Sequence, residues 1–179
     1  MTLLAGSRFA LGKDGREGTS GPQEERGVKG VRIGQTPHGY GVFATRGYRP
    51  GQVIGRVTGR LVEDPEFGSE YCIDVGTDRS LDPAPPFRFL NHSCEPNCEL
   101  VSEDVEDDCG KVVGVRVWVE AIRAIDPGEE LRIDYAWPAD TSIPCGCRSP
   151  NCRGWIVAAD QVHLVRRRRP RRPQASGRA

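Results

Sequence analysis

Apolar and polar residues alternate in several short stretches of this chain, which is the pattern of β-strands with one buried face. The clearest stretch is 112–119, where four valines would share one face and Arg116 and Trp118 the other. Shorter strands are predicted at 28–33, 38–44, 71–75 and 131–135, and as a pair within 51–63. Glycine (22) and proline (14) make up about a fifth of the 179 residues, above the average usage of roughly 12%, so turns are frequent. The pattern predicts a mainly β domain.

Three segments are expected to lie outside these strands. Residues 1–27 are rich in glycine and charge, and a disordered leader is expected there. The sequence Asp-Pro-Ala-Pro-Pro at 82–86 is predicted not to continue a strand, because proline has no backbone donor. A short helix is expected within 158–169, before Pro170 and a basic tail.

Charge is unevenly distributed, although the chain is neutral overall. The last fourteen residues hold seven arginines and no acid, so residues 1–165 carry a net charge of −7. An acidic body suits a cationic partner, whereas the run Arg166–Arg172 either contacts nucleic acid or is a solvated tail. Five carboxylates within 103–108 would either attract a basic peptide or form a solvated hairpin tip.

The stretch 88–97, Arg-Phe-Leu-Asn-His-Ser-Cys-Glu-Pro-Asn, concentrates groups that can bind a ligand. Asn91 both donates and accepts, His92 offers two ring nitrogens, and Cys94 can become a thiolate. Taken alone, the stretch is equally a polar turn with a buried cysteine. Glycines on both sides of Tyr40 likewise permit either a close approach to a ligand or a hairpin turn. Tyr135, at the end of an apolar face, is either a functional hydroxyl or a structural one bonded to backbone.

Cysteine usage points to a metal site. The seven cysteines, with three inside 145–152, favour metal binding over disulfides. They also favour an intracellular, reducing compartment, either cytoplasm or nucleus. No apolar run approaches the roughly 18 residues that span a bilayer. A structural zinc takes four ligands, so Cys145, Cys147 and Cys152 need a fourth, for which Cys94 is the best candidate. Unligated thiols are one alternative, and a redox pair is a weaker one because the spacing is CxC, not CxxC.

Taken together, these motifs in this order resemble the SET-domain protein-lysine methyltransferases with a post-SET zinc motif. The resemblance covers roughly residues 28–157 and rests on Gly39-Tyr40-Gly41, Tyr71, the stretch 88–97, Gly128-Glu129-Glu130-Leu131, Asp134-Tyr135 and the Cys145/Cys147/Cys152 cluster. It implies a SET-domain (β-clip-like) fold of small curved sheets with a C-terminal pseudoknot. The implied boundaries are 28–140 for the SET domain, 141–157 for the post-SET zinc segment, and 158–179 for a short helix and basic tail.

The resemblance also implies an activity and roles for single residues. The expected reaction is methylation of a lysine in a basic protein by S-adenosylmethionine. The alternative is a catalytically inactive zinc adaptor that could associate with nucleic acid. The implied catalytic residues are Tyr135 and Tyr71, and Tyr71 and Ile133 would line the lysine channel. Ile133 stands where relatives usually have phenylalanine or tyrosine, which predicts multiple methylation. The implied cofactor-binding residues are Gly39, Tyr40, Gly41, Asn91, His92, Tyr135 and Trp155, and the implied ligands of one structural zinc are Cys94, Cys145, Cys147 and Cys152.

Overall fold

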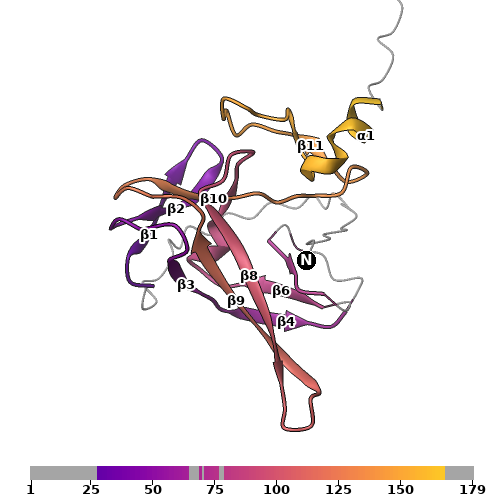
Figure 1. Cartoon of the computed structure of the whole chain (residues 1–179). Coiled ribbons are helices and arrows are strands. Elements are labelled where there is room, and N and C mark those ends of the chain that lie inside the picture. Colours follow the sequence, from indigo (N-terminus) through magenta and orange to yellow (C-terminus); the bar gives the residue numbers. More distant parts are fainter. Residues whose placement is uncertain (1–27, 65–68, 70, 77–78, 168–179) are drawn as a thin grey trace, which may run out of the picture.

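The computed structural model describes residues 28–64, 69, 71–76 and 79–167, which form four small β-sheets (Figure 1). The leader expected at 1–27 and the tail beyond residue 167 lie outside the described residues. The mainly β prediction is confirmed. Within the described part of the chain, no helix is long and apolar enough to cross a membrane.

The first sheet brings together segments that are far apart in the sequence. It contains β1 (Val31–Thr36), β2 (Gly39–Ala44), β10 (Glu130–Ile133) and β7 (Asn91–His92), in the order β1-β2-β10-β7. β2 pairs with β1 and β10 antiparallel, and β10 pairs with β7 in parallel. The strand expected at 28–33 begins three residues later, because Gly30 turns the chain with a φ of 93°.

The second sheet, β3 (Val53–Val57), β9 (Val112–Ala121) and β8 (Cys98–Glu106), carries the valine stripe. Val117 and Val119 are buried in the core, with 1% and 0% of their surface exposed, as the alternation predicts. Val113 on the same face is 58% exposed, because the β8–β9 hairpin projects beyond the body (Figure 1). The carboxylates of 103–108 lie exposed near the end of this hairpin, so their segment is a hairpin tip.

The third sheet corrects one prediction. It contains β4 (Gly59–Val62), β6 (Ser80–Pro83) and the short β5 (Ile73–Asp74), with β6 in the centre. Asp82 and Pro83, which were expected to interrupt a strand, are the last two residues of β6. β5 pairs only with Ser80 and Leu81, so Pro83 has a neighbouring strand on one side alone, where a missing donor is tolerated. The 3₁₀ helix η1 (Phe87–Phe89) follows.

The C-terminal part forms a second, smaller packing unit. β11 (Ile143–Pro144) pairs with β12 (Trp155–Ile156), and the 3₁₀ helix η2 (Ala159–Gln161) leads into α1 (Val162–Arg167). The short helix expected within 158–169 is therefore present. Val157, Val165 and Ala139 form a small core here, with Trp155 and Val162 packed against it.

The stretch 91–97 wraps around β10. Ser93 N donates to Ile133 O (2.9 Å), and Asn97 N donates to Arg132 O (3.2 Å). The side chain of Asn97, only 2% exposed, accepts from Arg132 N (2.7 Å) and donates to Glu130 O (2.8 Å). The segment that contains Tyr135 thus leaves β10 directly beside His92, which is the crossing expected of the pseudoknot.

Candidate active site

The amide of Asn91 joins β7 to two other strands. Its Nδ2 donates to Tyr40 O (3.0 Å) in β2 and to Glu130 Oε1 (2.8 Å) in β10. Gly41 lies tightly against the same groups, since a Cβ there would be 2.7 Å from Glu130 Oε1 and 3.1 Å from Asn91 Nδ2. Gly39 has a φ of 104° and open space around its α-carbon. Gly39 therefore permits the β1–β2 hairpin turn, and Gly41 permits the backbone to lie close to Glu130 and Asn91.

Tyr135 lies just beyond β10 and is anchored at both ends. Its hydroxyl donates to Leu90 O (2.7 Å), and its backbone N–H donates to His92 Nδ1 (3.2 Å). Its ring stacks on Trp137, with ring centroids 5.6 Å apart and an angle of 29° between the planes. Burial, together with the nearby Tyr71 and Glu130, raises the pKa of Tyr135 to about 12. The hydroxyl is therefore protonated at neutral pH and acts as a hydrogen-bond donor.

A cavity adjoins this tyrosine. Its volume of about 80 Å³ exceeds the roughly 10–15 Å³ that one water needs, so it has room for a group larger than a single water molecule. Tyr71 and Ile133, the two residues expected to line a lysine channel, lie in its wall together with Tyr135, which was expected to be catalytic. Tyr71 packs edge-on against Phe89 (ring centroids 6.4 Å apart), and the guanidinium of Arg88 lies over its ring at 4.3 Å. Trp137 also lines the cavity, whereas Trp155 does not.

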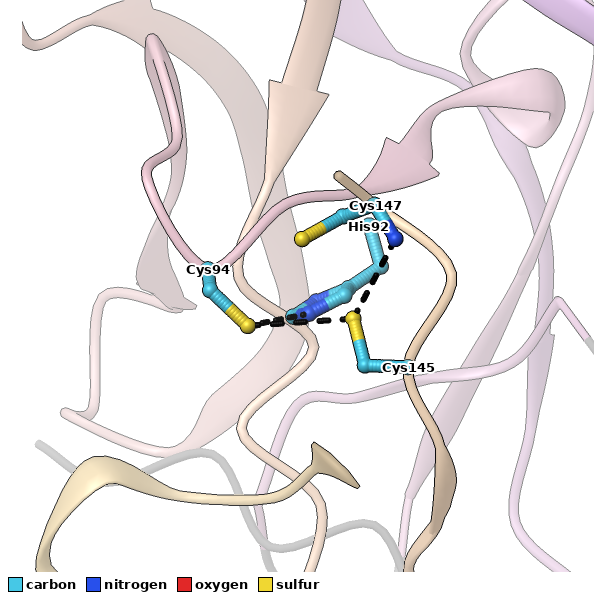
Figure 2. Close-up of side chains that lie close together, drawn as sticks. All are labelled: His92, Cys94, Cys145 and Cys147. Carbon is cyan, nitrogen blue, oxygen red and sulfur yellow. Dashed lines mark hydrogen bonds between the residues drawn. The ribbon is translucent and has the colours of Figure 1, made fainter. Parts of the chain in front are cut away.

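The cysteine cluster gathers beside His92. Cys94 Sγ lies 3.7 Å from Cys145 Sγ and 3.9 Å from Cys152 Sγ. The ligand atoms of His92, Cys94, Cys145 and Cys147 all lie within 4.8 Å of one another, and Figure 2 shows these side chains pointing toward one another. His92 Nε2 is 3.4 Å from Cys94 Sγ. The fold thus brings the four predicted cysteines together. It also places beside them the imidazole of His92, which was not among the predicted zinc ligands.

The chemistry and spacing of these donors fit zinc. All cysteines among the described residues are free thiols. A tetrahedral zinc with Zn–S bonds of about 2.3 Å would hold its sulfurs roughly 3.8 Å apart, close to the two separations from Cys94. Burial raises the pKa of Cys94 and of Cys145. At Cys147, hydrogen bonds, chiefly from Ser149, outweigh burial and lower the pKa to about 6, toward the thiolate that a metal requires.

A charged network connects the cysteine cluster to Tyr135. Asp134 Oδ1 accepts from Arg153 Nη2 (2.6 Å) and from Ala136 N (3.0 Å), and lies 3.5 Å from His92 Nδ1. Burial lowers the pKa of His92 to about 4, with Asp134 opposing this shift and Arg153 adding to it, so the imidazole is neutral. Sequence reasoning missed Trp137, Glu130 and Arg153 as site residues. Glu130 lies in the motif Gly128-Glu129-Glu130-Leu131, and Trp137 follows Tyr135 by two residues, so these two carried a local signal.

Comparison with known proteins identifies the class. The family model "SET domain" matches residues 39–136, more than half of the chain, and the chain belongs to this family. The resemblance drawn from the motifs is thereby confirmed. The crystal structure of KRYPTONITE in complex with mCHG DNA and SAH has a related fold, with a TM-score of 0.59 and 24% identity over 70% of this chain and 28% of that one.

The curated relatives are much longer proteins. Human histone-lysine N-methyltransferase SETD1B is 35% identical over 109 residues, which cover 59% of this chain and 5% of the relative. Histone-lysine N-methyltransferase ASHR3 of Arabidopsis thaliana is 30% identical over 148 residues, 73% of this chain and 29% of the relative. ATXR7, also from Arabidopsis thaliana and also named a histone-lysine N-methyltransferase, is 37% identical over 119 residues. The chain spans less than a third of the length of each.

Proposed function

We propose that this chain transfers a methyl group from S-adenosylmethionine to the side-chain amine of a lysine in a basic protein. The observation that carries the proposal is the position of Tyr135 in the wall of a cavity shared with Tyr71 and Ile133. Membership of the SET-domain family and relatives named histone-lysine N-methyltransferases support the same activity.

The cavity suits an amine that must react without its charge. Only the neutral amine has the lone pair that attacks a methyl group. Because the reference pKa of lysine is about 10.4, neutralising it near pH 7.5 costs roughly 4 kcal/mol. Apolar groups in the lining, such as Phe87, Leu90 and Leu100, disfavour the ammonium form and so reduce this cost, whereas the carboxylates of Asp74 and Asp134 in the same lining favour it.

Tyr135 would align the amine rather than remove its proton. With a pKa of about 12, its hydroxyl is protonated at neutral pH and donates to Leu90 O. The hydroxyl and the carbonyl oxygen of Leu90 that it contacts are polar groups that can fix the direction from which the amine approaches. Positioning of this kind supplies a large part of the rate enhancement when two reactants must meet in line.

When bound, the donor supplies an activated methyl on a sulfonium centre. The residues proposed to hold it are Gly39, Tyr40 and Gly41 through backbone atoms, Asn91 and His92 through the adjoining strand β7, and Tyr135. The open space around Gly39 would admit a ligand close to the main chain. Trp155 is proposed to cover the adenine from the post-SET segment, although it packs in the smaller C-terminal core and not in the cavity wall.

Zinc is proposed to have a structural role in this enzyme. Cys94, Cys145, Cys147 and Cys152 would hold it, with His92 as a neighbour that could replace one thiolate. Cys94 belongs to the stretch 88–97, and the other three belong to the segment 141–157. A metal shared between them would fasten that segment beside the proposed cofactor site. This chemistry also fits the reducing intracellular compartment expected from the cysteine usage.

The proposed substrate class follows from charge. Net negative charge in residues 1–165 and the exposed carboxylates of the β8–β9 hairpin favour a basic protein. Contact of nucleic acid with the run Arg166–Arg172 stays a prediction, since residues 168–172 lie outside the described part of the chain. The inactive adaptor is the alternative, and nothing among the described site residues favours it over the enzyme.

The deciding experiment is transfer of a radiolabelled methyl group to a panel of basic proteins. Tyr135→Phe is expected to lower the rate by about 100-fold, because the hydroxyl that aligns the amine is lost. Tyr48→Phe is the matched control, since Tyr48 is also buried and its hydroxyl also donates to a backbone oxygen, that of Gly30 (2.9 Å), outside the cavity. Undiminished transfer by Tyr135→Phe would remove Tyr135 from this role, and no binding of S-adenosylmethionine by the wild type would favour the adaptor.

A further inference from the structure

Arg153 connects the cysteine segment to the residues that follow β10. Its backbone N–H donates to Cys94 Sγ (3.4 Å), and its guanidinium donates to Asp134 Oδ1 (2.6 Å). It directly follows Cys152, whose Sγ is 3.9 Å from that of Cys94. One residue thus contacts the proposed metal cluster through its main chain and the neighbour of Tyr135 through its side chain.

Asp134 in turn determines how the chain leaves β10. Its Oδ1 accepts the backbone N–H of Ala136 (3.0 Å), which has a φ of 46°. A residue other than glycine in this left-handed region is unfavourable unless its surroundings impose it. The turn at Ala136 lies between Tyr135 and Trp137, whose rings stack in the cavity wall. The carboxylate of Asp134 therefore helps to orient both rings.

Other partners of Asp134 cannot replace the arginine. His92 Nδ1 is 3.5 Å from Asp134 Oδ1, but the same nitrogen accepts the backbone N–H of Tyr135 and is therefore unprotonated. Within the described part of the chain, the ion pairs of Asp134 are those with His92 and Arg153. The side chains of Arg153 and Asp134 are only 14% and 25% exposed, so water screens their attraction weakly.

We propose that the Arg153–Asp134 ion pair is a positioning contact that couples the ordering of the cysteine segment to the orientation of Tyr135 in the cavity. The inference rests on the proposed methyl transfer. Arg153 itself does not line the cavity. It acts through Asp134 and the turn at Ala136, so a segment that loses its metal would release Tyr135 and Trp137 as well.

The test compares Arg153→Ala with Arg153→Lys and with Arg148→Gln. Arg148 is an exposed arginine of the same segment and serves as the matched loss of one positive charge. Zinc per chain, affinity for S-adenosylmethionine, kcat and KM are measured for each variant. A readout independent of activity comes from fluorotyrosine labelling: the chain has four tyrosines, and the ¹⁹F signal of Tyr135 is assigned as the one missing in Tyr135→Phe.

Arg153→Ala is expected to keep its zinc and its affinity for S-adenosylmethionine, to lose about 10- to 100-fold in kcat, and to shift the Tyr135 signal. Arg153→Lys should recover part of kcat, and Arg148→Gln should match the wild type. An unchanged kcat and Tyr135 signal in Arg153→Ala would overturn the inference. Loss of zinc from that variant would also overturn the inference, because Arg153 would then act only by holding the metal site together. If the wild type transfers no methyl group, the proposed function fails, and the ¹⁹F signal still decides the coupling.

Discussion

The side chain of Asn97 is predicted to hold the crossing between the stretch 91–97 and β10. It is 2% exposed, and its amide and oxygen contact Glu130 O (2.8 Å) and Arg132 N (2.7 Å). Nδ2 also donates to Glu129 Oε1 (3.0 Å). Replacement by alanine leaves the carbonyl of Glu130 and the N–H of Arg132 without these partners in a site that water does not reach.

The loss of stability follows from the two backbone groups that lose their hydrogen-bond partners. Each buried group left without a partner costs about 1–3 kcal/mol, so Asn97→Ala should lower the free energy of unfolding by roughly 3 kcal/mol or more. The carboxylate of Glu129 adds little, because its side chain is 30% exposed and water can replace the amide. A loss of about 3 kcal/mol is a large part of the 5–15 kcal/mol that stabilises a typical domain, and would lower Tm by roughly 6–12 °C.

Urea denaturation followed by circular dichroism measures this cost. Asn151→Ala is the control, because it removes an amide whose bond to Glu95 Oε1 (2.6 Å) is exposed, and a change within about 0.5 kcal/mol is expected. Asn97→Asp should be destabilised at pH 7 as well, since it replaces the donor by an oxygen that faces Glu129 and the carbonyl of Glu130. If Asn97→Ala and Asn151→Ala unfold at the same urea concentration with equal slopes, Asn97 does not hold the crossing.

Three further predictions concern the cavity, the metal and acid stability. Ile133→Phe should narrow the cavity and shift the products toward monomethyl-lysine in mass spectra, and an unchanged distribution would contradict the role given to Ile133. Cys145→Ser, or a chelator, should reduce zinc below one per chain and abolish methyl transfer, whereas full activity without metal would refute a required zinc. At Glu129, burial raises the pKa, but hydrogen bonds from Arg123 and Asn97 prevail and lower it, so the stability it contributes is lost as pH falls through the folded-state pKa. Arg123→Ala should therefore flatten the acid side of the stability curve, and an identical pH profile would contradict this.

Some of the fold was predictable because it depends on residues close together in the sequence. The alternation at 131–135 places Leu131 and Ile133 on the buried face, and both are buried. The acidic run at 103–108 and its flanking valine strand form the two arms of one hairpin. Where the alternation overstated burial, as at Val113, the reason lies in tertiary structure: the hairpin extends past β3, which pairs with β9 only from Val117 onward.

Other contacts of the site depend on the pairing of distant segments. Glu130 faces Asn91 only because β10 pairs with β2 on one side and with β7 on the other. Arg153 reaches Asp134 only because the cysteine segment folds back over the stretch 88–97, where Ser149 contacts Ser93 (2.9 Å). His92 was expected near the cofactor, and the fold also brings it to the cysteines.

The sequence by itself determined the mainly β class, the strand faces, the family and the identity of the reactive side chains, since periodicity and motif composition are properties of neighbouring residues. Only the tertiary structure decided which of these side chains meet. Contacts such as Asn91 with Glu130, Tyr135 with Leu90, and Arg153 with Asp134 join residues 19 to 45 positions apart. Such contacts depend on strand register and on the crossing at Asn97, and no local sequence pattern predicts either of these.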